Sequence, residues 1–538
     1  MLSYRKLAMR VLGRPLHTGR IDSPRPASQR AAAFALTAAM LITLTAPAFA
    51  ETWYIENGDI TVKASGTEGK NTVSQGTNKD VVDTNTIITN QNKDTTSSHT
   101  VTIETNDKND KVEVTLKDVN IDTSSRNKAA VSVTGEGDTN IKLDGDNALK
   151  SDIYRSGIYG SGSLTISGGE NDSLTAQGGS GANGISSSGS LTISGGTVTA
   201  NGDDGGRGIS SSGSVTISGG STVTANGGSG TISGGDGIWS GGGVTISGGS
   251  TVTANGGNGG SLVGGSGISN GGSLTVSDGT VTAKGGNGDS KDGYGGDGIR
   301  SGGGVTISGN TVNAAGGYGG KVGGYGICSF DRVGVAISGG TVEAAGGNGS
   351  TGGGSGIYSS VIDLSGSLEL TAKAGSPNGK ALSRAGYELD LNDIKDKLDP
   401  GAKVTATDAN GETKQVSIPR PVEPEESSSS SDGGSSAPSA PVSSLPGLTV
   451  TDKDGQRISY TSTQSGNTLT VCVGRFTASF RISLAALRQL RAEGIETITF
   501  QTVLCSTTLS VDELLAMGGE DAEAVLTHRF TDSSLTVG

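Results

Sequence analysis

The sequence predicts a mostly β protein: a right-handed parallel β-helix with three sheets around one narrow core, followed by a disordered linker and a small α+β domain. Three observations lead to this fold class. Glycine supplies 93 of the 538 residues, whereas Phe, Trp and Tyr together supply only 19, too few for a conventional core. Short aliphatic islands recur at intervals of 24 to 31 residues, which indicates a stacked repeat. Proline, at 12 residues, is too scarce for collagen.

A Gly-Ile pair marks each repeat, from Gly157 to Gly356, and two further islands follow it. They are of the types LTISGG, as at 191–196, and TVTANGG, as at 222–228. Each island alternates apolar and polar residues, which is typical of a strand with one buried face. Islands this short cannot form a core alone, so we expect each to pair in parallel with its copies in neighbouring repeats.

This stacking predicts three inward columns of branched aliphatic residues, which suit parallel sheets. They are Ile158, Ile185, Ile209, Ile238, Ile268, Ile299, Ile327 and Ile357; then Ile166, Ile193, Ile217, Ile246, Val276, Ile307 and Ile337; then Val198, Val223, Val252, Val281, Val312 and Val342. The interval length varies mainly after the third island. Loops such as 226–236, 255–266 and 285–297 should therefore project from one edge, where repeat proteins usually bind ligands.

The N-terminal segment is typical of a secretion signal. Residues 1–30 contain seven basic residues and one acidic residue, and an uncharged stretch ending in Ala48-Phe49-Ala50 follows. We interpret residues 1–50 as a signal peptide, with a retained membrane anchor as the alternative. Its removal takes away seven of 40 basic and one of 53 acidic residues, which leaves 33 against 52 and a net charge of −19. Such a charge does not favour nucleic acid or an anionic membrane as partner, and we expect a secreted or cell-surface protein.

The solenoid itself is predicted for residues 111–375. Residues 51–110 are expected to form an N-terminal cap with irregular strands, because an open parallel edge invites aggregation. Residues 376–418 should close the other end with a short helix and a hairpin. A Pro- and Ser-rich linker over 419–446 then leads to the small α+β domain at 447–538.

The C-terminal domain is predicted to contain two helices, at 483–494 and 510–519, each begun by a serine N-cap. It also contains Cys472 and Cys505, which are the expected disulfide pair in an exported protein. Cys328 would then be a small apolar residue rather than a reactive thiol.

The residue after each Gly-Ile pair should point outward, because the isoleucine points inward. This outer column contains Tyr159, Trp239, Arg300 and Tyr358 among smaller residues. Aromatic rings offer platforms for sugar rings, and arginine pairs well with a carboxylate. These four are therefore the candidate carbohydrate-binding residues, with Trp239 and Arg300 two coils, about 10 Å, apart. The alternative is that a neighbouring loop covers Trp239.

A family resemblance rests on VEVTLKDVNI at 112–121, AAVSV at 129–133 and repeated units such as that at 182–200. Through these segments, residues 111–375 resemble the secreted right-handed β-helix carbohydrate-binding proteins of anaerobic, plant-fibre-degrading bacteria, which share the architecture of pectate lyases. The resemblance implies binding of cellulose-like or acidic plant polysaccharide, with calcium held by acidic turns. Asp236 and Asp297, each before a Gly-Ile pair, are the candidate calcium ligands; solvated turn aspartates are the alternative.

The functional hypothesis is a secreted, non-catalytic protein that binds a polysaccharide or cell-surface glycan through the loop edge and the Trp239 face. A structural adhesin or cell-surface spacer is the alternative, and a polysaccharide lyase is a second one. No catalytic residue is assigned. Beyond residue 50 the chain has only His99 and His528, in different predicted domains, which does not favour Ser-His-Asp catalysis or a His-based zinc site.

Overall fold

The computed structural model describes residues 51–419, apart from 66 and 68, and residues 447–537, apart from 452–456, 459, 466, 474–476, 503–505, 520–521 and 529–532. The predicted signal peptide and nearly all of the predicted linker lie outside the described residues. The chain divides into two compact units between Glu423 and Pro424, and each unit is described by itself.

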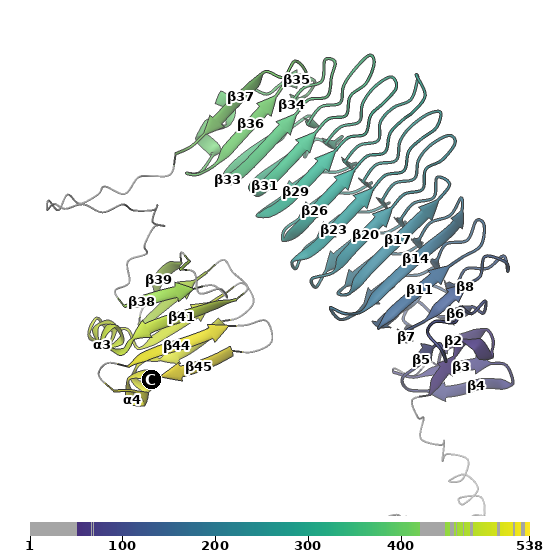
Figure 1. The fold of residues 1–538 in the computed structure, drawn as a ribbon, viewed down its shortest axis with the longest axis horizontal. Helices are drawn as coiled ribbons and strands as arrows, with labels where there is room; N and C mark the ends of the chain where they lie inside the picture. Colours follow the sequence, from purple (N-terminus) through teal and green to yellow (C-terminus); the bar gives the residue numbers. More distant parts are fainter. Residues whose placement is uncertain are drawn as a thin grey trace, which may run out of the picture. The chain divides into compact units, whose positions relative to one another are not determined.

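The first unit is a parallel β-solenoid, as the sequence predicts (Figure 1). Its first ladder, which contains the Gly-Ile strands, consists of β2 (Ile60–Ala64), β6 (Val101–Glu104), β9 (Val131–Thr134), β12 (Ile158–Gly160), β15 (Ile185–Ser187), β18 (Ile209–Ser211), β21 (Ile238–Ser240), β24 (Ile268–Asn270), β27 (Ile299–Ser301), β30 (Ile327–Ser329), β32 (Ile357–Ser359) and β34 (Leu382–Arg384). Each of these strands pairs in parallel with the next.

The second ladder consists of β1 (Thr52–Tyr54), β5 (Ile87–Thr89), β7 (Lys111–Lys117), β10 (Asp138–Asp144), β13 (Leu164–Ser167), β16 (Leu191–Ser194), β19 (Val215–Ser218), β22 (Val244–Ile246), β25 (Leu274–Val276), β28 (Val305–Ile307), β31 (Val335–Ala345) and β33 (Ile362–Lys373). The third consists of β8 (Asn120–Asp122), β11 (Asp146–Lys150), β14 (Ser173–Ser180), β17 (Thr197–Asp203), β20 (Thr222–Asn226), β23 (Ser250–Asn255), β26 (Gly279–Lys284), β29 (Asn310–Ala315), β31, β33 and β36 (Lys403–Thr407). Because β31 and β33 run through both, these two ladders form one continuous sheet.

The predicted inward columns form the core. Ile185, Ile209 and Ile238 are successive register partners and all three are completely buried. The second and third columns are equally buried, as Ile193 and Val198 show. Alternation within each strand therefore places every aliphatic side chain of an island against its copy one coil away, and the core is one continuous aliphatic stack.

The loops after the third ladder form a second ordered layer, which we call the glycine wall: residues 227–236, 256–266, 285–297, 316–325 and 346–355. Its glycines hydrogen-bond from coil to coil; Gly257 donates to the carbonyl of Gly235, and Gly265 donates to that of Gly257, both at 2.8 Å. A Cβ on Gly265 would lie 1.9 Å from the Gly235 oxygen. At these glycines the two legs of each predicted projecting loop pack backbone against backbone, with no room for a side chain between them.

Both ends of the solenoid are closed by antiparallel strands. At the N-terminal end, η1 (Ile55–Asn57) follows β1, while β3 (Asn71–Gln75) and β4 (Asn78–Asp83) add antiparallel to β2. Coil stacking begins at β1, so residues 52–104 contribute stacked strands rather than only an irregular cap. At the other end lie β35 (Tyr387–Glu388), η2 (Leu391–Lys397) and β37 (Thr413–Ser417), the last pairing antiparallel with β36.

The second unit is a small α+β domain. One sheet contains β38 (Leu448–Thr451), β41 (Ala478–Ser483), β44 (Glu523–His528) and β45 (Ser533–Val537); the other contains β39 (Thr461–Ser465), β40 (Thr468–Cys472), β42 (Thr497–Gln501) and β43 (Ser506–Ser510). The helices α3 (Leu484–Ala492) and α4 (Val511–Met517) begin after the N-caps Ser483 and Ser510, close to the predicted limits. Cys505 of the predicted disulfide lies outside the described residues. No helix in the described ranges is long and apolar enough to cross a membrane.

Candidate functional site

The outer column of the first ladder contains all four predicted carbohydrate-binding residues. Register pairing makes it one continuous file: Tyr159, Ser186, Ser210, Trp239, Ser269, Arg300, Cys328 and Tyr358. Since paired strands are about 4.8 Å apart, Trp239 stands about 14 Å from Tyr159 and about 10 Å from Arg300. The fold therefore brings large side chains from distant repeats onto one face, separated by small ones.

Trp239 is half-buried, and one face of its ring is already in contact with a cation. The guanidinium of Arg207, from the neighbouring coil, lies 4.3 Å from the ring centroid, which is a cation–π arrangement. The Arg207 Nε also donates to Asp236 Oδ2 at 3.4 Å. Arg207 therefore links the Trp239 ring to the Asp236 carboxylate within the chain.

Arg300 and Tyr358 belong to an aromatic cluster that sequence reasoning described only in part. Tyr358 stacks on Tyr325 with ring centroids 4.8 Å apart, and Phe330 lies 6.1 Å from Tyr358. The Arg300 guanidinium stands 4.6 Å from the centroid of Phe330. Cys328 is completely buried in this cluster, and burial raises the pKa of its thiol well above the ordinary value. Tyr325 directly precedes a Gly-Ile pair and Phe330 follows β30. Neither belongs to the outward column, so that column gave no signal for them.

In every second coil from Asn183 to Asp297, the side chain of the residue before the Gly-Ile pair accepts a hydrogen bond from the backbone of the next coil. Asp236 Oδ1 accepts the backbone N–H of Ser266 at 2.8 Å, and Asp297 Oδ1 accepts that of Tyr325 at 2.7 Å. Asn183 accepts the N–H of Arg207 in the same way, at 2.8 Å. An uncharged amide thus does what the two carboxylates do, which is to tie one coil to the next.

Asp236 and Asp297 do not fit a calcium site. The second oxygen of each faces a guanidinium, that of Arg207 for Asp236 and that of Arg300, at 3.2 Å, for Asp297. Calcium takes six to eight oxygen ligands, and in the described part of the chain no three His, Cys, Asp or Glu side chains gather as metal ligands. Burial raises the pKa of both carboxyl groups, although the backbone N–H groups and the arginines oppose it.

A groove of about 580 Å³ opens around Tyr159, at the N-terminal end of the outer column. Its lining includes Tyr154, Arg155 and Lys128 from the turns beside β9 and β12, together with Ser132. Both tyrosines are exposed, Tyr154 at 77% and Tyr159 at 42%. Sequence reasoning identified Tyr159 alone, because its neighbours in space come from turns that do not follow the repeat.

The chain matches no protein-family model, no curated protein and no solved structure.

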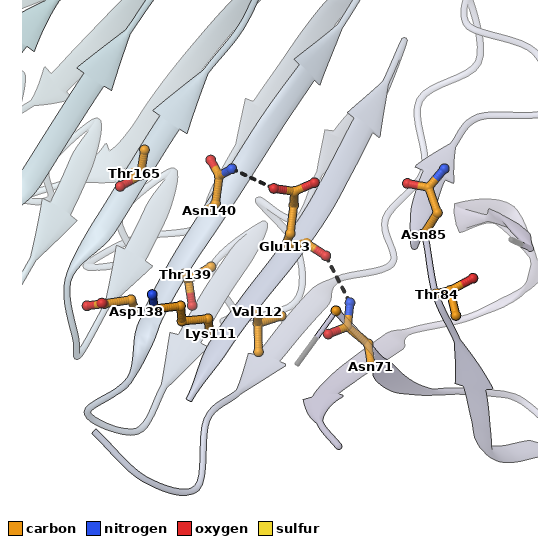
Figure 2. A pocket seen from close by; sticks show the side chains of 11 residues that line it. Asn71, Thr84, Asn85, Lys111, Val112, Glu113, Asp138, Thr139, Asn140 and Thr165 are labelled. Atoms are coloured by element: carbon orange, nitrogen blue, oxygen red, sulfur yellow. Dashed lines mark hydrogen bonds between the residues drawn. The ribbon is translucent and has the colours of Figure 1, made fainter. Parts of the chain in front are cut away.

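A second hollow, of about 390 Å³, lies between the N-terminal hairpin and the second ladder (Figure 2). Some of its polar groups pair with one another, whereas the hydroxyl of Thr139, which also lines it, is buried without a hydrogen-bond partner. The Asn71 amide donates to the carbonyl of Glu113 at 2.9 Å, and the Asn140 amide donates to the Glu113 carboxylate, also at 2.9 Å. This hollow offers amides and threonine hydroxyls but no aromatic platform among its lining residues.

The edge of the glycine wall, the other predicted binding surface, presents single large side chains in successive coils. Leu262, Tyr294 and Tyr318 are 55%, 43% and 49% exposed. Lys321 places its ammonium 5.6 Å from the centroid of the Tyr294 ring. The edge therefore offers aromatic and aliphatic contacts together with exposed charged side chains, since Asp289, Lys291 and Lys321 belong to these loops.

Proposed function

We propose that the protein is an exported, non-catalytic polysaccharide-binding protein and that the outer column of the first ladder is its principal binding face. The observation that carries the proposal is the register of this column, in which Tyr159, Trp239, Arg300 and Tyr358 share one face at multiples of the coil spacing. A polysaccharide is itself a linear repeat, so a linear file of rings and guanidinium groups can contact several sugar units at once.

The alternative is a structural adhesin or spacer, in which the solenoid only provides length. One observation favours it: Trp239 and Tyr358 already pack against Arg207 and Tyr325 within the chain. In this alternative the large residues of the outer column stabilise neighbouring coils and contact no sugar. The two functions make opposite predictions for the variant described next.

Purified residues 51–538 applied to an array of plant and microbial glycans test the proposal. We expect retention on at least one polysaccharide, and we expect Trp239→Ala to weaken it about tenfold, because the ring is lost from the centre of the column. Tyr387→Ala is the matched control, since Tyr387 is 79% exposed at the C-terminal end of the solenoid. Failure to bind any glycan, or equal retention by Trp239→Ala and the parent, would favour the spacer.

A further inference from the structure

The groove around Tyr159 differs in charge from the rest of the protein. The full chain has a net charge of −13. Of the residues that line the groove, Lys128 and Arg155 are charged and both are basic; the others are Thr100, Thr102, Asn127, Ala129, Ser132, Tyr154, Ser156, Tyr159 and Ser186. No carboxylate lines the groove itself, although Asp59 and Asp152 bind the lining residues Lys128 and Asn127 from outside it. An anion inside the groove would therefore meet the two cations directly.

The two cations of the groove are held in place without being fully neutralised. Arg155 donates from Nε to Asn127 Oδ1 at 3.3 Å, an uncharged partner. Lys128 contacts Asp59 at 3.0 Å, but that carboxylate also binds Arg126 through both of its oxygens, at 2.6 and 3.1 Å. The three cations Arg126, Lys128 and Arg155 stand against the two carboxylates Asp59 and Asp152, so one positive charge remains at the groove.

Tyr154 is held over the groove in an unfavourable backbone conformation. Its φ is 58°, in the left-handed region that non-glycine residues rarely adopt. Its ring lies against the backbone of the next coil at Gly181, where a Cβ would come within 2.8 Å of the ring. Backbone strain of this kind persists only where the surrounding structure imposes it, and it is common at ligand-binding sites. Here it places an exposed ring beside Arg155 and within the same groove as Tyr159.

We propose that this groove is a subsite for an anionic sugar unit, one that carries a carboxylate or a sulfate ester. The Tyr154 and Tyr159 rings would contact the apolar face of the sugar. The Arg155 guanidinium and the Lys128 ammonium would pair with its anionic group, and guanidinium suits the two-oxygen geometry of such groups. The inference rests on the proposed function and deepens it, because it selects charged glycans over neutral ones.

The test measures dissociation constants by calorimetry for residues 51–538 with four probes: an oligogalacturonate, its methyl ester, a sulfated oligosaccharide and its desulfated form. We expect at least one anionic probe to bind about tenfold more tightly than its uncharged counterpart, and the preference to shrink as salt is added. The pair that shows the difference identifies the anion. Arg155→Gln and Tyr154→Ala should each weaken binding of that anionic probe about tenfold.

Lys142→Gln is the control for charge, since Lys142 is exposed on β10 and does not line the groove; it should leave the affinity unchanged. Equal binding of charged and uncharged probes, or an affinity unaffected by Arg155→Gln, would overturn the anionic subsite while polysaccharide binding stands. If the glycan array also shows no binding at all, the proposed function itself fails.

Discussion

At the scale of single residues, aspartates of this solenoid have two roles: some accept hydrogen bonds from the backbone, and Asp59 forms ion pairs. Asp297, which is buried, and Asp236, which is partly buried, accept hydrogen bonds from the backbone of the next coil, and burial raises their pKa. Asp59 is only partly buried and binds two cations, Arg126 and Lys128. Burial raises the pKa of Asp59, but hydrogen bonds from Arg126, Lys128, the Thr100 N–H and His99 outweigh it and lower the pKa well below 3.8. The charged form therefore matters for Asp59, whereas Asn183 shows that an amide suffices for the coil-to-coil contact.

The depressed pKa of Asp59 predicts a stability contribution that depends on pH. The contribution is fully present above the ordinary pKa of 3.8, and it is lost as the pH falls from there through the lower pKa of the folded state. Asp59→Asn should cost about 1 kcal/mol at pH 7, because solvent screens a side chain exposed to this extent. Urea unfolding of variant and parent at pH 7 and pH 2 measures the difference, which should shrink at pH 2. A cost that is the same at both values would contradict the charge-based explanation.

At the scale of elements, the glycine wall explains the composition of the chain. The two legs of each loop pack backbone to backbone, with Gly265 donating to Gly257 and Gly286 donating to Gly265, each at 2.8 Å. Side chains have no room there: a Cβ on Gly257 would lie 2.1 Å from the oxygen of Gly228. The close approach of the backbone thus requires glycine in the wall, whereas a positive φ only favours it at turns such as Gly249.

This contrast gives a prediction with an internal control. Gly265→Ala should destabilise the solenoid by about 1–3 kcal/mol, the usual cost of forcing extra volume into a packed interior. Gly249→Asn should cost less than about 1 kcal/mol, because nothing lies within 4 Å of a Cβ there and asparagine tolerates its φ of 71°. Thermal unfolding of both variants compares them. Equal losses would mean that the wall is not tightly packed.

The sequence predicted those elements that have a side-chain period. Ile185, Ile209 and Ile238 could be aligned because alternation and the Gly-Ile pair fix their register. The order of the wall could not be predicted, since glycine has no side chain to reveal a period. The groove was also missed, because the position of Arg155 beside Tyr159 depends on a turn that contains Tyr154 in a left-handed conformation.

At the scale of the whole molecule, the chain builds two hydrophobic cores of different kinds. The solenoid core begins with the buried Trp53 and continues as a stack of aliphatic side chains to Ala406. The core of the second unit includes the aromatic pair Phe480 and Phe500, with ring centroids 4.8 Å apart. No described residue belongs to both cores. Each unit therefore buries its apolar surface by itself, which is the physical condition for independent folding.

We therefore predict that residues 51–419 and 447–538 fold as separate proteins. Each fragment should unfold cooperatively at the temperature of the matching transition in residues 51–538, because neither loses core contacts when the other is removed. Differential scanning calorimetry of the three proteins makes the comparison. A fragment of residues 51–233 is the control. It keeps only the N-terminal coils and ends in a parallel edge without a cap, so we expect its copies to associate with one another. A cooperative transition lost from either full unit on separation would show that one core depends on the other.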